Sequence, residues 1–190
     1  MDIGLYFGSF NPIHTGHLII VNHILNETGL QKIWLILSPQ NPFKTNEKLL
    51  NESKRLSLVE KATHDDERIV VSDVEFKLSL PSFTINTLNY LKENYPQHNF
   101  SIIMGSDSFQ NLHKWKNFEA IIRNYKILIY RRPGFEAENK INARIEILNA
   151  PLLDISSTDI RRLIKEGKSI RYLVPQQVRE EIEKNQYYKE

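Results

Sequence analysis

The chain contains no cysteine among its 190 residues, so disulfide bonds and thiolate chemistry are excluded. No apolar run approaches the ~20 residues that a membrane-spanning helix needs. The chain starts with a strand-like stretch that carries Asp2, rather than with the basic and apolar regions of a signal peptide. These absences favour a cytoplasmic protein that does not associate with membranes.

A large excess of one charge is absent as well. The formal net charge is +2, which predicts no extended nucleic-acid-binding surface. Hydrophobic residues make up 41% and charged residues 25%, a balance typical of a globular protein, and the length suits one domain. We therefore expect a single domain over residues 1–190 without a nucleic-acid partner. The sequence leaves the oligomeric state open.

Short apolar runs alternate with amphipathic helical patterns, which predicts βαβ units and a parallel sheet. The expected strands are residues 3–7, 33–37, 69–71, 100–104 and 127–130. Right-handed crossovers would place them in an α/β, doubly wound (Rossmann-like), mostly parallel sheet within residues 1–130. A short strand is expected at 145–148, and residues 150–190 are expected to form a small C-terminal helical subdomain.

The turn from Gly8 to His17 is the most informative stretch of the sequence. It follows an apolar strand and precedes a helix whose apolar residues share one face, with Gly29 at the expected helix end. In an open α/β sheet, such a turn lies at the carboxyl end of the strand, where ligands bind. The helix start offers unpaired N–H groups to phosphate, while Gly8 permits close approach and Pro12 stiffens the turn.

Two histidines carry the chemistry of this turn. His14 and His17 are three residues apart, so both can point at one locus if the helix begins near Thr15. Imidazole is a compact donor that can charge near neutrality, which suits phosphate oxygens that gain negative charge. A lone histidine is more often structural, but a pair at this spacing favours function. A zinc site lacks ligands, because cysteine is absent and no clear third ligand accompanies the pair.

This turn resembles the GxFxPxHxGH signature of a nucleotidyltransferase superfamily that joins a nucleoside triphosphate to a phosphate-bearing acceptor. Every fixed letter of the signature is present, as Gly8, Phe10, Pro12, His14, Gly16 and His17. The resemblance implies ATP contacts by Gly8, Ser9, Phe10, His14 and His17.

A second phosphate site is predicted from Ile155 to Arg161. Serine hydroxyls and amides at a helix start can bind phosphate, and Arg161 adds a forked donor. The alternative is simple capping of this helix by Ser157 or Thr158. The stretch resembles the ISSTxIR motif of the same superfamily. That resemblance implies triphosphate contacts by Ile155, Ser156, Ser157, Thr158 and Arg161.

A carboxylate follows the fourth expected strand. Gly105 and Asp107 should face the first turn across the crevice, where a carboxylate can hydrogen-bond ribose or help to place a metal ion. The alternative for Asp107 is a helix N-cap. Trp115 follows eight residues later, and it is either a core residue or a flat face for an aromatic ring.

Further motifs resemble the bacterial nicotinate mononucleotide adenylyltransferases. Residues 81–88 match the S-[YF]-T-x-x-T-L stretch of that family. The Gly105-Ser106-Asp107 run with its spaced tryptophan, the turn at 131–134 and the segment 173–175 match the same family. Together the motifs cover nearly the whole chain.

The resemblance implies roles for the residues that would hold the pyridine mononucleotide. Phe83 and Thr84 would bind the pyridine carboxylate, largely through backbone amides, and Trp115 would stack on the ring. Asp107 would bind ribose or assist a metal ion. The remaining residues assigned to this substrate are Asn41, Lys44 and Arg132.

Two positions depart from the family pattern. The NPPHK loop that is common in the family reads Asn41-Pro42-Phe43-Lys44 here, and Lys44 can still attract phosphate. Asn11 stands where the family often has Asp, which removes one negative charge near the phosphates. We do not expect the change at residue 11 to abolish the chemistry.

The predicted reaction is adenylyl transfer from ATP to nicotinate mononucleotide, which gives the deamido dinucleotide and pyrophosphate. No general base is needed, because a phosphate monoester with a second pKa near ~6 is largely dianionic at neutral pH. Catalysis would combine positioning with charge stabilisation by His14, His17, Lys44 and Arg161, and Mg²⁺ would be held mainly by the triphosphate. The alternatives are another acceptor (nicotinamide mononucleotide, phosphopantetheine or flavin mononucleotide) and a nucleotide-binding regulator without turnover.

Overall fold

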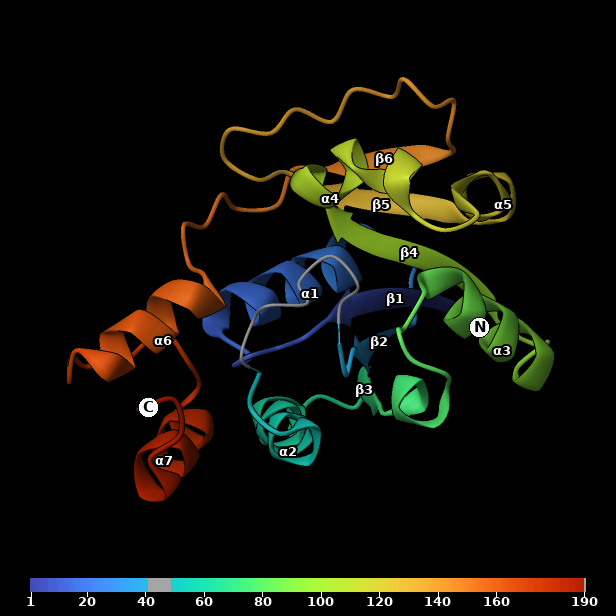
Figure 1. Cartoon of the computed structure of the whole chain (residues 1–190). Helices are drawn as coiled ribbons and strands as arrows, with labels where there is room; N and C mark the ends of the chain where they lie inside the picture. The colour runs from blue at the N-terminus through green and yellow to red at the C-terminus, as the bar shows by residue number, and fades with distance from the viewer. Residues whose placement is uncertain (41–48, 190) are drawn as a thin grey trace.

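The structure is a computed structural model that describes residues 1–40 and 49–189, and within them the strands form one six-stranded sheet (Figure 1). The strands are β1 (Asp2–Gly8), β2 (Lys32–Leu37), β3 (Ile69–Ser72), β4 (Asn99–Gly105), β5 (Lys126–Tyr130) and β6 (Ile145–Leu148). Their order is β3-β2-β1-β4-β5-β6, and every neighbouring pair is parallel. The predicted α/β, doubly wound sheet is therefore confirmed. It extends beyond residue 130, because β6 pairs with β5.

Helices lie in the connections between successive strands up to β5, as right-handed crossovers require. They are α1 (Thr15–Glu27), α2 (Glu52–Thr63), α3 (Thr84–Asn94), α4 (Ser106–Gln110) and α5 (Phe118–Asn124). Two further helices, α6 (Ser157–Lys165) and α7 (Gln176–Asn185), follow β6. Short 3₁₀ helices, η1 (Val74–Lys77) and η2 (Leu112–Lys114), lie within two of the connections.

Both faces of the sheet are buried, which the nearly continuous apolar strands predict. Tyr6 of β1 packs into a core cluster that also contains side chains of α1, α2, α6 and α7. Ile3 and Leu5 of the same strand belong to a second cluster, with side chains of α3, α4 and α5. Successive side chains of β1 therefore point into two hydrophobic cores, one on each face of the sheet.

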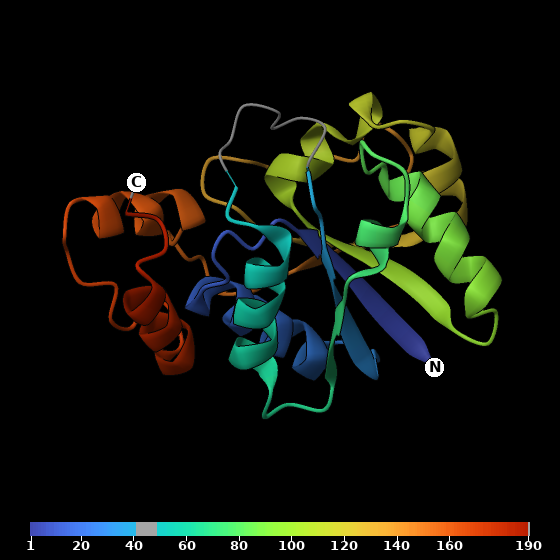
Figure 2. The same ribbon diagram turned by 60° about the horizontal axis from the view of Figure 1, so that its bottom comes forward.

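The C-terminal helices α6 and α7 stand to one side of the sheet, next to α2 (Figure 2). Val178 and Ile182 of α7 are buried. Lys61 Nζ of α2 lies 2.5 Å from Glu181 Oε2 of α7. The small C-terminal helical subdomain expected from the sequence is present.

The ends of α1 and α6 fall where the two glycines predict them. Thr28 is the C-cap of α1, and its hydroxyl donates to the Ile24 carbonyl at 2.7 Å, so Gly29 is the first residue after the cap. Gly167 likewise follows Glu166, the C-cap of α6, and has a φ of +66°.

Within residues 1–40 and 49–189, no helix is both long and apolar enough to cross a bilayer.

Candidate active site

The candidate site lies where β1 and β4 end side by side in the middle of the sheet. The chain leaves β1 into α1 on one face and leaves β4 into α4 on the other. The carboxyl ends of these strands are therefore a topological switch point, where open α/β sheets bind ligands. Gly8 and Gly105 are the last residues of the two strands.

The two histidines lie together at the start of α1. Their rings are stacked, with centroids 3.6 Å apart and an interplanar angle of 24°. The backbone N–H of His14 donates to His17 Nδ1 at 3.2 Å. Because Nδ1 accepts this bond, a neutral His17 carries its proton on Nε2, which leaves Nε2–H as a donor. The predicted convergence of the pair is confirmed.

Burial keeps both histidines neutral in the ligand-free protein. It lowers the pKa of His14 to about 4, with a smaller contribution from the positive charge of Arg132. Burial also lowers the pKa of His17 well below its usual value, assisted by His14 and then by Arg132. The sequence suggested imidazoles that charge near neutrality. The structure instead provides neutral donors, whose pKa would rise only when an anion arrives beside them.

Glycines give these rings their space. A Cβ atom at Gly16 would lie 3.0 Å from His14 Nδ1, and one at Gly8 would lie 2.8 Å from Phe10 Cζ. Phe10 is 2% exposed and meets the His17 ring edge-on at 5.2 Å. Gly8 therefore makes room for the Phe10 ring as well as for a ligand. The Phe10 ring in turn packs edge-on against the His17 ring.

Helix α6 closes the phosphate turn from the other end of the chain. Ser157 Oγ donates to the Pro12 carbonyl at 2.9 Å. Arg161 Nη1 donates to the Asn11 carbonyl at 2.7 Å. The two motifs that the sequence separates by about 140 positions therefore form one site.

The first turn of α6 is capped one residue earlier than the capping alternative assumed. Ser156 is the N-cap, and its hydroxyl accepts the Asp159 N–H at 3.1 Å. Ser157 is thereby left to bond the phosphate turn. Thr158 Oγ1 accepts Arg161 Nη2 at 3.4 Å, and the Ile155 side chain lies beside Gly16.

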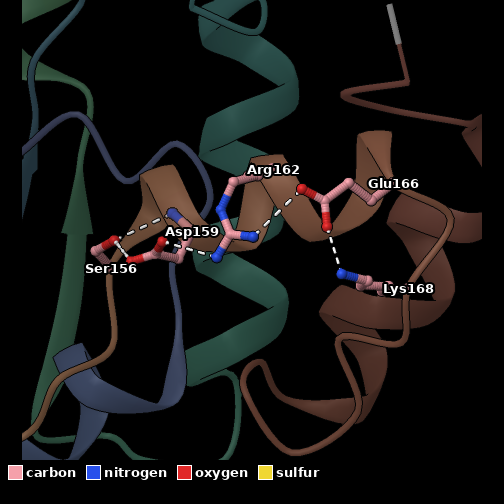
Figure 3. Close-up of polar contacts among 5 residues, drawn as sticks. All are labelled: Ser156, Asp159, Arg162, Glu166 and Lys168. Carbon is pink, nitrogen blue, oxygen red and sulfur yellow. Dashed lines mark hydrogen bonds and ion pairs between the residues drawn. The ribbon is translucent and has the colours of Figure 1, made fainter.

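The outer face of α6 carries a chain of ion pairs, drawn in Figure 3. Arg162 pairs with Asp159 at 3.2 Å and with Glu166 at 3.3 Å, and Lys168 pairs with Glu166 at 2.7 Å. More than half of the Arg162 side chain is exposed. Exposed pairs of this kind contribute little to stability. This chain of charges is a solvated helix surface rather than part of the site.

The segment 172–173 completes the start of α1. The Thr15 N–H donates to the Leu173 carbonyl at 2.9 Å, and Thr15 Oγ1 donates to the Tyr172 carbonyl at 3.1 Å. These bonds satisfy a first-turn N–H of α1 that has no partner within the helix. Leu173, the first residue of the 173–175 motif, therefore lies beside the phosphate turn.

Opposite the histidines, a carboxylate and an arginine meet at the end of β4. Asp107 Oδ1 lies 3.9 Å from Arg132 Nε, and a side chain at Gly105 would overlap the Asp107 carboxylate. The Arg132 N–H donates to Ser106 Oγ at 2.9 Å, which fixes the turn after β5 against α4. Gly105 rather than Asp107 is the N-cap of α4, so the Asp107 carboxylate remains available at the crevice.

A cavity of about 130 Å³ continues from this crevice towards α3. Phe83, Thr84 and Trp115 all line it, together with Gly8 and Gly105 from the strand ends. Phe83 is the N-cap of α3, so the first N–H groups of the helix lie at the cavity and lack acceptors within the helix. The structure thus brings together the residues that were expected to hold a pyridine ring and its carboxylate.

The chain is similar in sequence to known proteins over most of its length. The cytidylyltransferase-like family matches residues 5–163. A nicotinate-nucleotide adenylyltransferase of Flavobacterium johnsoniae is 50% identical over the full length of both chains. A protein of the same name from Bacteroides thetaiotaomicron is 41% identical, and the match covers 96% of this chain and 91% of the relative.

The chain belongs to the nicotinate-nucleotide adenylyltransferase family. Its fold is also that of a solved Plasmodium falciparum nicotinic acid mononucleotide adenylyltransferase complexed with NaAD. The TM-score is 0.83 at 21% identity, and the match covers 98% of this chain and 97% of that one. The structural likeness therefore extends over the C-terminal helices as well as the sheet.

Residue 11, where the family often has aspartate, makes a structural bond. Asn11 is 1% exposed, and its Oδ1 accepts the Leu50 N–H at 3.1 Å. Asn11 therefore ties the phosphate turn to the residue that precedes the N-cap of α2. An aspartate oxygen could accept the same bond, so nothing in this contact explains the asparagine.

Charged residues at the cavity were missed by the sequence analysis. Glu75 of η1 lines it at 1% exposure, and its Oε1 accepts the Thr87 hydroxyl at 2.8 Å. Burial raises the pKa of Glu75, against the hydrogen bond from the Thr87 hydroxyl, which lowers it. Lys116 also lines the cavity, with Nζ 4.4 Å from the centre of the Phe83 ring. Neither residue belongs to a local motif, and only the fold brings them here.

Two of the predicted site residues, Asn41 and Lys44, lie within residues 41–48 and thus outside the described part of the chain. Their roles, and the effect of Phe43 in place of the family's histidine, stay predictions.

Proposed function

We propose that this chain transfers the adenylyl group of ATP to nicotinate mononucleotide, which forms deamido-NAD and pyrophosphate, a step of NAD biosynthesis. One observation carries the proposal. The bonds from Ser157 and Arg161 to residues 11 and 12 join the two phosphate motifs into one site beside the cavity of Phe83 and Trp115. A triphosphate and a pyridine mononucleotide can therefore meet at the ends of β1 and β4.

The reaction forms a bond between a 5′-phosphate oxygen of the mononucleotide and the α-phosphorus of ATP. The bond from that phosphorus to the pyrophosphate oxygen breaks, and its electron pair leaves with pyrophosphate. The attacking phosphate is largely dianionic at neutral pH, since its second pKa is near ~6, so no side chain has to remove a proton. The protein's task is to align the two substrates and to stabilise the charge that develops.

The histidines serve as donors to phosphate oxygens in this proposal. His17 offers Nε2–H because its Nδ1 is occupied by the His14 N–H. Both rings start neutral, so they do not have to lose counter-ions before ATP binds. Negative charge on the bound phosphates then raises their pKa, which strengthens the hydrogen bonds as charge develops. Arg132 and Arg161 supply the fixed positive charges.

ATP enters as its Mg²⁺ complex in this proposal. Within residues 1–40 and 49–189, no group of three or more histidine, aspartate or glutamate side chains could hold a metal ion. The residues present therefore fit a metal that arrives on the triphosphate, with the Asp107 carboxylate available at the crevice. The ion supplies charge neutralisation on the phosphates.

The acceptor binds on the other side. We assign the pyridine carboxylate to the N–H groups at the start of α3, where Phe83 and Thr84 lie. Trp115 is half-buried and offers its face to the pyridine ring, while Asp107 accepts from ribose hydroxyls. The expected location of the reaction is the cytoplasm, a prediction that rests on the sequence.

A direct assay tests the proposal and its rivals. The purified protein is incubated with Mg-ATP and, in parallel, with nicotinate mononucleotide, nicotinamide mononucleotide, phosphopantetheine or flavin mononucleotide. Pyrophosphate release and the dinucleotide product are measured. Turnover with nicotinate mononucleotide supports the proposal, turnover only with another acceptor corrects it, and binding without pyrophosphate release would identify a regulator.

A further inference from the structure

Helix α2 carries a buried arginine that belongs to none of the motifs. Arg55 is 1% exposed and lies on the face of α2 that also buries Leu58 and Val59. A buried guanidinium is costly unless its donors are satisfied. The hydrogen-bond partners of Arg55 therefore show which parts of the fold depend on this buried side chain.

Those partners are main-chain carbonyls from separate segments. Arg55 Nη1 donates to the Ser9 carbonyl at 2.6 Å and to the Ser38 carbonyl at 2.9 Å. Nη2 donates to the Pro39 carbonyl at 3.1 Å, and Nε donates to the Leu50 carbonyl at 2.8 Å. One side chain thus joins the phosphate turn after β1, the chain that leaves β2, and the residue before the N-cap of α2.

The bond to Ser9 acts on a strained residue. Phe10, the residue after Ser9, has a φ of +43°, a left-handed conformation that is unusual for a phenylalanine. Such a strained conformation persists only where the surroundings hold it. The angle φ of Phe10 describes how the Ser9–Phe10 peptide is turned, and Arg55 holds that peptide by its carbonyl oxygen.

A short path of contacts leads from this peptide to the chemistry. The Phe10 ring is buried and meets the His17 ring edge-on at 5.2 Å. A change in the Ser9–Phe10 peptide therefore moves the surface against which His17 rests. The hydrogen bonds of Arg55 itself go to main-chain carbonyls, so its effect on the chemistry passes along this path of contacts.

We propose that Arg55 is a positioning residue for adenylyl transfer, which holds Phe10 in its left-handed conformation and thereby fixes His17 at the phosphate turn. The inference rests on the proposed function and adds a residue that the motifs do not contain. Because misplacement by about 1 Å can cost on the order of a hundredfold in rate, the effect of Arg55 should appear mainly in kcat.

The test compares Arg55→Met and Arg55→Lys with a matched control on the same helix. Thr63 is also buried, and its hydroxyl donates to the Val59 carbonyl at 3.0 Å, about two helical turns along α2 from Arg55. Thr63→Val therefore removes a buried polar group from α2 without touching Ser9. All variants are assayed at a temperature where circular dichroism shows them fully folded.

Arg55→Met is expected to lower kcat by about ten- to a hundredfold, while the KM for nicotinate mononucleotide changes by less than about threefold. Arg55→Lys should recover part of kcat, because an ammonium can reach some of the carbonyls. Thr63→Val should lower the unfolding midpoint and leave kcat unchanged. A kcat within twofold of wild type in Arg55→Met, or an equal kcat loss in Thr63→Val, would overturn the inference.

A second measurement does not depend on the acceptor. The imidazole resonances of His17, followed by NMR in the ligand-free protein, should shift in Arg55→Met and stay in place in Thr63→Val. If wild type uses another mononucleotide, the proposed function fails, and the kcat comparison is made with that acceptor. Unchanged His17 resonances in Arg55→Met would reject the positioning role even if the proposed function holds.

Discussion

The two sides of the crevice are built in different ways. The phosphate side is built around one turn, where His14 and His17 are three residues apart, and α6 and the segment 172–173 bond to that turn. The pyridine side collects Glu75 and Phe83 from the connection between β3 and β4, and Trp115 from the connection between β4 and β5. A site made of neighbours in sequence can be recognised as a motif, whereas a site assembled from distant segments depends on the fold.

Their electrostatics differ as well. On the phosphate side, burial favours the uncharged form of two bases, and arginines supply the positive charge. On the pyridine side, burial favours the uncharged form of an acid, Glu75, and the exposed Lys116, which also lines the cavity, supplies a positive charge. The pyridine side therefore loses a negative charge that would oppose a carboxylate, whereas the phosphate side depends on its arginines for the charge that attracts phosphate. Changes confined to one side should separate the two contributions.

The largest effect is expected on the phosphate side. His17→Ala should lower kcat by about a hundredfold or more, because one donor to developing charge is worth roughly 3 kcal/mol. Steady-state kinetics with both substrates saturating measure this effect. His23→Ala, on the same helix, serves as the control and should stay within about twofold of wild type. A near-normal kcat in His17→Ala would remove His17 from the catalytic residues.

The choice between acid and amide probes the pyridine side. Nicotinate mononucleotide should exceed nicotinamide mononucleotide by at least about a hundredfold in kcat/KM, or roughly 3 kcal/mol. The amide would set its NH₂ against an N–H donor at the start of α3, which leaves that donor unpaired. Lys116→Met should reduce the ratio by about fivefold, as an exposed charge permits. Equal values for the two substrates would reject this acceptor but not adenylyl transfer.

Acidification should affect the two sides in opposite directions. The pKa of His14 is about 4 in the folded protein and near 6.5 when unfolded, so the unfolded chain binds more protons between these values. The free energy of unfolding should therefore fall as pH drops from 6.5 to 4, by up to about 3 kcal/mol from His14. Glu75 contributes with the opposite sign, because its raised pKa makes the folded state bind its proton more readily.

Urea unfolding at a series of pH values tests this contrast. His14→Gln should flatten the loss of stability between pH 6.5 and 4, and Glu75→Gln should steepen it. If both variants follow the wild-type curve, the pKa of His14 is not lowered and the pKa of Glu75 is not raised in the folded protein.

Trp115→Ala should change one substrate only. Loss of stacking, worth about 1–3 kcal/mol, should raise the KM for the pyridine mononucleotide by about ten- to a hundredfold. The KM for ATP should stay nearly the same, because ATP is expected on the other side. If Trp115→Ala lowers only the unfolding midpoint and leaves the kinetics unaltered, Trp115 is a core residue.

The smallest effect is expected outside both sides. Arg162→Ala removes the centre of the exposed chain of charges on α6 (Figure 3). The melting temperature should barely change, and kcat should stay within about twofold. Thermal unfolding and the standard assay measure both. A large loss of activity would show that the outer face of α6 belongs to the site.

Much of the fold could be predicted because its signals are local. Each strand is a short apolar run, and their alternation with helical patterns defined the parallel sheet. The positions of His14, His17 and Arg161 followed from motifs of a few residues each. In these cases the sequence pattern and the structural role span the same short stretch of chain.

Buried charges could not be predicted in this way. Arg55 and Glu75 occupy stretches that read as the polar parts of a helix and a connection, yet both are 1% exposed. Their burial depends on carbonyls and hydroxyls that other segments bring to them. The N-cap of α6 shows the same limit on a smaller scale, because three neighbouring hydroxyl residues could each cap the helix.

The bonds of Thr15 to residues 172 and 173 bear on how the protein becomes active during synthesis. Thr15 Oγ1 and the Tyr172 carbonyl are 157 residues apart, so the six strands of the sheet have all been synthesised before this contact can form. Contacts over such separations form late, since the intervening chain must first be ordered. A nascent chain can therefore fold its sheet while the histidine turn still lacks its cover. Only a polypeptide that includes residue 173 would hold ATP in the reactive arrangement.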